Sequence, residues 1–391
     1  ESDKMSLGEK NMRKGKIFVA LMMLLVGCSK PIVQKKEPPK KPLNSHFQVV
    51  KHYETKSVAG DSANFHYLER NKLYTSMERY DQEILLQYRS KSLGYIDITN
   101  GKYTSIYHFK HRVRCWDFFV QGKGFYYSEF EEDGEMVTVG YQENGQRKKI
   151  DEGVIVNPWA LPMFNKVEGN RLLYQIITRE NGRHFHQLKT INLDYPNDVK
   201  TLYKEEVKPE INSNYRYSVN QNRVTFNKRE GKKGWYLSLD LKTGKVTDVT
   251  GVIEDPIISD ALYLGNNQYL LENIDGHSSV VYDIKKKKEI LSFGGNRNLW
   301  VGIGDRQFFS TTDVLTDGSL AKRGELVELK DGKIRTVEVK GYKKVGDEFE
   351  RMFYSNGKLV IADQKLVHFD DKDRRNTVII DVVEEKNEEN N

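Results

Sequence analysis

The sequence of 391 residues predicts an all-β chain built from a repeated unit. Short runs of β-branched and aromatic residues alternate with Asn-Gly, Asp-Gly, Thr-Gly or lysine-rich turns, while helical periodicity is nearly absent. A composition with 38% hydrophobic residues, 11% aromatic residues and only 9 prolines excludes a disordered or collagen-like chain. Related turns recur about every 45 residues, the period of four-stranded blades. The expected fold is therefore a β-propeller.

The repeat is clearest in three hairpins, which place an acidic residue ahead of turn residues, a glycine and a lysine: Tyr95–Tyr103, Leu237–Lys245 and Leu326–Lys333. Weaker copies occur around Gly140, Asp194, Asp283 and His368. The copies are 40 to 54 residues apart and predict seven blades, although six or eight would also be compatible. A tandem of sandwich domains would repeat near 100 residues instead.

One repeat contains four expected strands, which are Tyr215–Val219, Arg223–Asn227, Gly234–Asp240 and Lys245–Val249. Such a sheet needs neighbours on both faces, so radial stacking is expected. A further strand over His46–Thr55 either closes the ring against Asn376–Val383 or lies outside it.

The pairs Ile96-Asp97, Leu239-Asp240 and Val327-Glu328, each expected to end a third strand before a glycine turn, resemble those of Tol-associated and YVTN-like bacterial propellers. The resemblance covers nearly the whole body. It implies an architecture and no particular chemistry.

The N-terminal segment resembles a signal peptide. Arg13, Lys14 and Lys16 precede the apolar run Ile17–Val26, which as a helix would span about 15 Å, half of a bilayer core. We expect a signal helix within residues 1–27, with translation starting at Met12. The following residues, 28–45, are rich in lysine and proline and predict a flexible tether ahead of a single propeller domain over residues 46–391.

The sequence Leu25-Val26-Gly27-Cys28 resembles the bacterial lipobox. This resemblance implies cleavage between Gly27 and Cys28 and a diacylglyceryl group on the Cys28 sulfur, with acyl chains such as palmitate holding the protein in a membrane. The expected location is extracytoplasmic, on the cell membrane or an outer membrane. An ordinary secretory signal with an incidental cysteine is the alternative.

The net charge of +6 belongs to the N-terminal segments. Residues 1–27 carry +2 and residues 28–45 carry +4, so the body has no bulk charge that would attract nucleic acid. A local basic patch on the body would still be compatible with this charge. Cys115, beside Val113 and Trp116, is expected to be a buried apolar residue rather than a reactive thiol.

Contiguous catalytic motifs for hydrolases, phosphate loops and metalloproteases are absent from the sequence. His184 and His186 could face one side of a strand, but two ligands are too few for a metal. We therefore expect no metal and no cofactor, and the protein is interpreted as a binder more readily than as an enzyme.

The segments that lead into each blade's innermost strand should surround one mouth of the central channel. They contain the candidate ligand-face residues, in which aromatic rings stand beside Arg and Asn side chains suited to sugars, peptides or proteins: Arg112, Arg114, Trp116, Asn157, Trp159, Tyr215, Asn296, Arg297 and Trp300. The tryptophans could instead be wedges between blades.

The leading hypothesis is a lipid-anchored propeller that binds or scaffolds an envelope protein, peptide or glycan. The alternative is a cell-envelope glycan lyase or hydrolase whose acid and base at the channel mouth include Asp255, Glu348 and Glu350. A sensory ectodomain partner that presents solutes to a membrane complex is a third hypothesis.

Overall fold

The computed structural model describes residues 45–56, 61–81, 88–130, 134–156, 161–208, 217–254, 258–273, 279–293, 300–304, 306–309, 325–330, 333–343, 351–366 and 376–387. The predicted signal peptide, Cys28 and the tether up to Asn44 lie outside these residues. Within them, every regular element is a strand, and no helix is long and apolar enough to cross a membrane.

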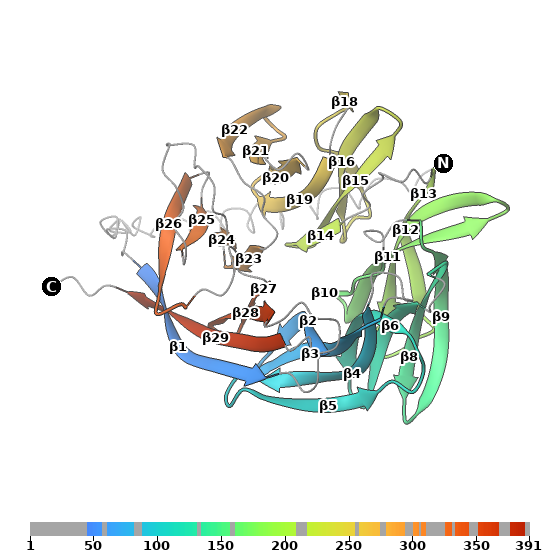
Figure 1. Cartoon of the computed structure of the whole chain (residues 1–391). Coiled ribbons are helices and arrows are strands. Elements are labelled where there is room, and N and C mark those ends of the chain that lie inside the picture. Colours follow the sequence, from blue (N-terminus) through green and yellow to red (C-terminus); the bar gives the residue numbers. More distant parts are fainter. Residues whose placement is uncertain are drawn as a thin grey trace, which may run out of the picture. The chain divides into compact units, whose positions relative to one another are not determined.

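The strands form seven blades arranged around a central axis (Figure 1). Blade 1 consists of β2 (Asp61–Glu69), β3 (Lys72–Tyr80), β4 (Tyr88–Asp97) and β5 (Lys102–His108). Blade 2 consists of β6 (Arg114–Gln121), β7 (Gly124–Phe130), β8 (Met136–Glu143) and β9 (Gln146–Val154). Blade 3 consists of β10 (Asn165–Val167), β11 (Arg171–Glu180), β12 (Arg183–Asn192) and β13 (Val199–Val207).

Blade 4 consists of β14 (Tyr217–Asn220), β15 (Arg223–Glu230), β16 (Lys233–Asp240) and β17 (Val246–Asp248), with the short β18 (Ile253–Glu254) also paired to β16. Blade 5 consists of β19 (Ile258–Gly265), β20 (Gln268–Asn273), β21 (Ser279–Asp283) and β22 (Lys288–Phe293). Blade 6 consists of β23 (Trp300–Ile303), β24 (Arg306–Phe309), β25 (Glu325–Lys330) and β26 (Lys333–Lys340). These blades confirm the four strands expected per repeat.

The N-terminal strand closes the ring. Blade 7 takes β27 (Arg351–Ser355), β28 (Lys358–Leu366) and β29 (Asn376–Asn387) from the C-terminus and β1 (Ser45–Lys56) from the other end of the domain. The antiparallel β1–β29 pairing runs from Ser45 opposite Asn387 to Lys56 opposite Thr377. A two-residue parallel pairing of β1 with β26 also joins blades 6 and 7 into one sheet. Of the two roles left open for this segment, ring closure is therefore confirmed.

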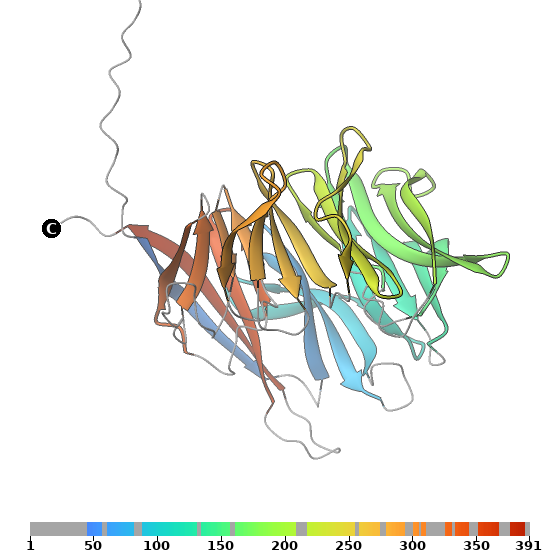
Figure 2. The same ribbon diagram turned by 90° about the horizontal axis from the view of Figure 1, so that it is seen from above.

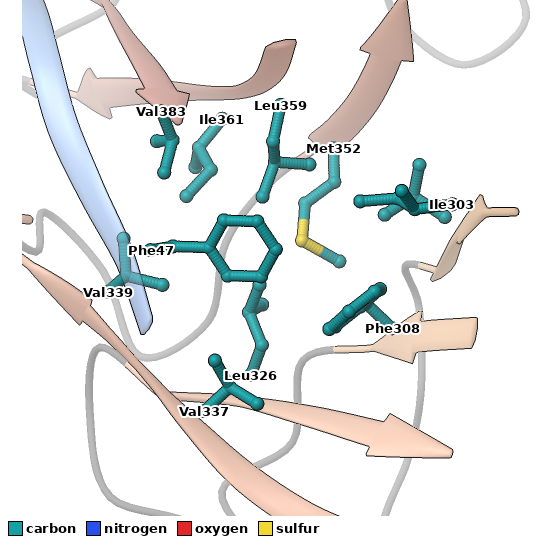
Figure 3. Packing of buried hydrophobic residues seen from close by; sticks show 11 residues of the cluster. Phe47, Ile303, Phe308, Leu326, Val337, Val339, Met352, Leu359, Ile361 and Val383 are labelled. Atoms are coloured by element: carbon teal, nitrogen blue, oxygen red, sulfur yellow. The ribbon is translucent and has the colours of Figure 1, made fainter. Parts of the chain in front are cut away.

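Apolar clusters fill all seven interfaces between neighbouring blades in the described part of the chain. The interface of blades 6 and 7 is built around Phe47 of β1, which meets the ring of Phe308 edge-on at 5.3 Å and packs beside Met352 and Val339 (Figure 3). Because each blade buries both faces, the wheel has no separate lobe.

The acidic residues of the repeat organise turns. Asp97 ends β4, and its Oδ1 accepts the backbone N–H of Thr99 at 2.8 Å. Asp240 ends β16 and accepts the N–H of Lys242 at 2.9 Å, and Asp283 does the same for Lys286 at 3.0 Å. The pKa of all three carboxyls is lowered, chiefly by the Thr99 hydroxyl at Asp97, by the Thr243 N–H at Asp240 and by the Lys286 N–H at Asp283. The motif therefore marks third-strand ends, as expected.

The copies of the motif in blades 3 and 6 deviate from this pattern. In blade 3 the strand ends at Asn192, and its side-chain oxygen accepts the N–H of Asp194, so Asn192 rather than Asp194 occupies the repeat position. In blade 6 Glu328 lies two residues before the end of β25 and pairs with Arg306 and Arg335. The expectation that Val327-Glu328 ends the third strand is wrong, because β25 continues to Lys330, which pairs directly with Lys333 of β26.

Candidate functional site

The two edges of the wheel carry different connections. Connections from one blade's outer strand to the next blade's inner strand, together with the turns between second and third strands, lie at what we call the loop edge. The remaining turns, between first and second and between third and fourth strands, lie at the opposite turn edge, because all neighbouring strands within a blade are antiparallel. The segment entering β6 therefore belongs to the loop edge.

The structure places three of the predicted ligand-face residues together, at the start of β6. Arg112 precedes this strand, Arg114 begins it, and Trp116 follows two residues later. Trp300 begins β23 opposite Phe309, and only this strand position is described. The other predicted residues lie outside the described residues: Asn157, Trp159, Tyr215, Asn296 and Arg297, together with Asp255, Glu348 and Glu350 of the enzyme hypothesis.

Arg112 is fixed by a carboxylate of the neighbouring blade. Its Nε donates to Asp81 Oδ2 at 2.8 Å, and its Nη2 donates to Asp81 Oδ1. Asp81 follows β3 of blade 1 and also lies 3.6 Å from Nε of Arg89. The fork holds the Arg112 guanidinium in one orientation, while about a third of its side chain (34%) stays exposed.

Arg114 lies deeper and joins an ion pair to two aromatic rings. Its Nη2 donates to Glu78 Oε2 at 3.2 Å. Its guanidinium carbon lies 5.3 Å from the ring centre of Trp116 and 5.5 Å from that of Tyr88. The arginine is only 8% exposed, so it positions the rings and is not itself open to solvent.

Glu78 is the electrostatically unusual member of this group. Burial raises the pKa of its carboxyl, and the nearby Arg114 and His66 oppose that rise. One carboxylate oxygen, Oε1, is buried without a hydrogen bond. We call Glu78, Asp81, Tyr88, Arg112, Arg114 and Trp116 the blade 1–2 cluster.

Sequence reasoning missed a buried hydrogen-bond relay next to this cluster. His66 Nδ1 lies 2.7 Å from Asp117 Oδ1, and its Nε2 lies 2.9 Å from Ser76 Oγ. The other oxygen of Asp117 accepts the backbone N–H of Phe164 at 2.6 Å, so the relay links blades 1 and 2 to the segment entering blade 3. No short motif could reveal it, since its members come from β2, β3 and β6.

The order of atoms in this relay is that of a nucleophilic Ser-His-Asp triad. Ser76, however, has no exposed surface, and a reacting group must reach the nucleophile. The relay therefore satisfies polar groups inside an interface, which is the common role of such networks in a core.

Of the two histidines considered as metal ligands, His186 packs inside the wheel. His186 is buried, and burial lowers its pKa to about 4. Its ring lies edge-on to Tyr203 and Phe226, with centroids 6.3 and 6.1 Å away. In the described residues no group of three or more His, Cys, Asp or Glu side chains is placed to hold a metal ion.

No family model matches the sequence, and no curated protein matches it significantly. Solved structures that resemble it include a chain of a nidogen/laminin complex, with a TM-score of 0.34 and 10% identity over 62% of this chain and 93% of that one. A puromycin-hydrolysing peptidase of Mycobacterium tuberculosis has a TM-score of 0.49 and 9% sequence identity, over 77% of this chain and 49% of the peptidase. TolB from Acinetobacter baumannii has a TM-score of 0.38 and 15% sequence identity, over 67% of this chain and 62% of TolB.

This chain therefore spans about half of the peptidase and less than two thirds of TolB. At these identities and TM-scores the similarities assign no ligand or reaction. The assignment as a closed seven-bladed propeller rests on the strand pairing described above.

Proposed function

We propose that the protein is a binding or scaffolding module that engages an envelope protein, peptide or glycan through the loop edge of its propeller. The observation that carries this proposal is the blade 1–2 cluster, in which Asp81 holds the partly exposed Arg112 and Glu78 holds Arg114 over the rings of Tyr88 and Trp116. Arginine and aromatic side chains contribute most of the binding energy at many interfaces.

The cluster is suited to binding because its groups are already ordered. Asp81 fixes two of the three donor nitrogens of Arg112, and the half-buried Trp116 also packs against the apolar cluster between blades 2 and 3. Fixed side chains lose little conformational entropy when a ligand docks. The partly exposed side chains of Trp116 and Arg112 would then contribute stacking area and a charged planar group.

The proposal includes the membrane anchor. A lipidated Cys28 would hold the wheel outside the cytoplasm on a tether rich in lysine and proline. Metabolic labelling with palmitate tests this part, because label should enter the wild-type chain and not Cys28→Ser. Equal labelling of both would contradict the anchor and leave the binding surface untouched.

The binding surface is tested by cross-linking intact membranes and recovering the protein with its neighbours. Arg112→Ala and Trp116→Ala should lose the partner that the wild type retains, and Arg112→Lys should recover little because lysine lacks the fork that Asp81 fixes. Tyr195→Ala is the matched control, since Tyr195 is 68% exposed at the turn edge. Unchanged partners in the first two variants, or products released from a captured glycan, would contradict the proposal.

A further inference from the structure

Exposed lysines gather at the turn edge of three consecutive blades. Blade 4 contributes Lys242 and Lys245 from the β16–β17 turn, blade 5 contributes the run Lys285–Lys288 around the β21–β22 turn, and blade 6 contributes Lys333 at the start of β26. All of these residues are exposed. We call them the basic arc.

Little of this charge is neutralised locally. Lys242 lies 3.7 Å from Glu168, and Lys286 lies 3.3 Å from Asp283. In the part of the chain that the structure describes, no carboxylate forms an ion pair with the other members: Lys245, Lys285, Lys287, Lys288 and Lys333. The turn aspartates Asp240 and Asp283 stay ionised, because backbone N–H groups stabilise their carboxylates, and their two negative charges offset only part of the seven lysines. The arc therefore carries excess positive charge, although the body as a whole is neutral.

The polypeptide enters the wheel at this same edge. Ser45 pairs with Asn387 at the end of β29, and β1 then runs toward the loop edge, where it leads into blade 1. Figure 2 shows the wheel from the side, with the C-terminal end of β29 at the upper edge. Since blade 7 adjoins blade 6, the point of entry lies next to the basic arc in blade order.

The geometry points to an anionic membrane surface as the partner of the basic arc, with phospholipid phosphates as the groups recognised. Lysine ammonium groups are compact point charges that suit phosphate without demanding a fixed geometry. Residues 28–44 add five lysines against one glutamate immediately before Ser45. These 17 residues can span at most about 60 Å, so a surface that holds Cys28 lies within reach of the arc.

This orientation turns the loop edge, with the blade 1–2 cluster, away from the membrane. The docking itself needs no acyl group, because it depends on charges of the wheel. A failure of membrane docking by the basic arc can therefore be distinguished from a failure of partner binding at the loop edge.

The test is vesicle co-sedimentation of the full chain carrying Cys28→Ser, titrated with phosphatidylcholine vesicles and with vesicles that also contain phosphatidylglycerol. A lysine near an anionic surface contributes about fivefold in affinity, so Lys285→Gln, Lys287→Gln and Lys288→Gln together should weaken binding to the anionic vesicles about 100-fold. The apolar run Ile17–Val26 is present in every variant, so the ratio between variants isolates the arc.

The matched control is Lys232→Gln with Lys233→Gln, two exposed lysines in the β15–β16 turn at the loop edge. We expect this pair to leave vesicle binding unchanged. Equal affinity for neutral and anionic vesicles, an equal loss in the loop-edge control, or no loss in the triple variant would each overturn the inference.

Discussion

Replacing Phe47 with alanine tests the closure of the wheel at the contact where it is made. Phe47 is 2% exposed and is the buried residue that β1 contributes to the apolar cluster between blades 6 and 7, against which the partly buried Val49 also packs. The change removes a buried aromatic ring and its edge-on contact with Phe308.

The expected cost follows from burial. Truncation of a fully buried phenylalanine lowers the free energy of unfolding by about 3–5 kcal/mol. For a domain of this size each kcal/mol corresponds to about 2 °C in melting temperature, so scanning calorimetry should record a fall of about 6–10 °C.

Val50→Ala is the control in the same strand, because Val50 is 40% exposed. It should change the free energy of unfolding by less than about 0.5 kcal/mol. If Phe47→Ala lowered the melting temperature no more than Val50→Ala does, β1 would not seal the ring and the reasoning would be refuted.

Three further predictions concern buried charges and the thiol. Arg114→Met should lower the free energy of unfolding in urea by about 3–5 kcal/mol, because it leaves Glu78 buried without its cation. Adding Glu78→Gln to this variant should recover most of the loss. An equal loss in the single and the double variant would contradict the pairing. The hydrogen bond to Asp381 raises the pKa of His52. The difference in thermal stability between the wild type and His52→Gln should therefore be largest just below about pH 6.5 and should vanish as the pH rises through that raised pKa. The gap should shrink again in stronger acid, where Asp381, whose own pKa burial raises, becomes protonated; a gap that grows toward alkaline pH would refute the bridge. Burial raises the pKa of the Cys115 thiol well above its usual value, so native Cys28→Ser protein should resist maleimide until unfolded, and rapid native labelling would contradict that burial.

The sequence was sufficient for the repeat because each blade repeats its own local chemistry. Asp97 and Asp240 cap turns through bonds that span only two or three residues, so their spacing is visible without any tertiary information. Positive φ angles at Gly101 and Gly244 follow the same motif, whereas in blade 5 Lys287 adopts this conformation without a glycine. The lack of a glycine at this position explains why the blade 5 sequence matches the repeat motif only weakly.

The candidate site could be predicted only in part, because its contacts cross between blades. The segment around Arg112 and Trp116 was recognisable from its position before an inner strand. The partners that bury Arg114 and orient Arg112 are more than 30 residues earlier in the chain, on β3 and directly after it. The relay through His66 and the bridge between His52 and Asp381 are likewise long-range, and no local pattern encodes them.

The central claim is that β1 and β29 pair in the register that completes blade 7. An engineered disulfide tests it, with Thr55→Cys and Val378→Cys at directly opposed positions in a Cys28→Ser background. The alternative pair, Thr55→Cys with Ile379→Cys, is displaced by one residue and places the two side chains on opposite faces. We expect mild oxidation to join the first pair within one chain and to raise its melting temperature, while the displaced pair stays reduced. Failure of the first pair to join, or equal joining of both, would contradict closure by this strand.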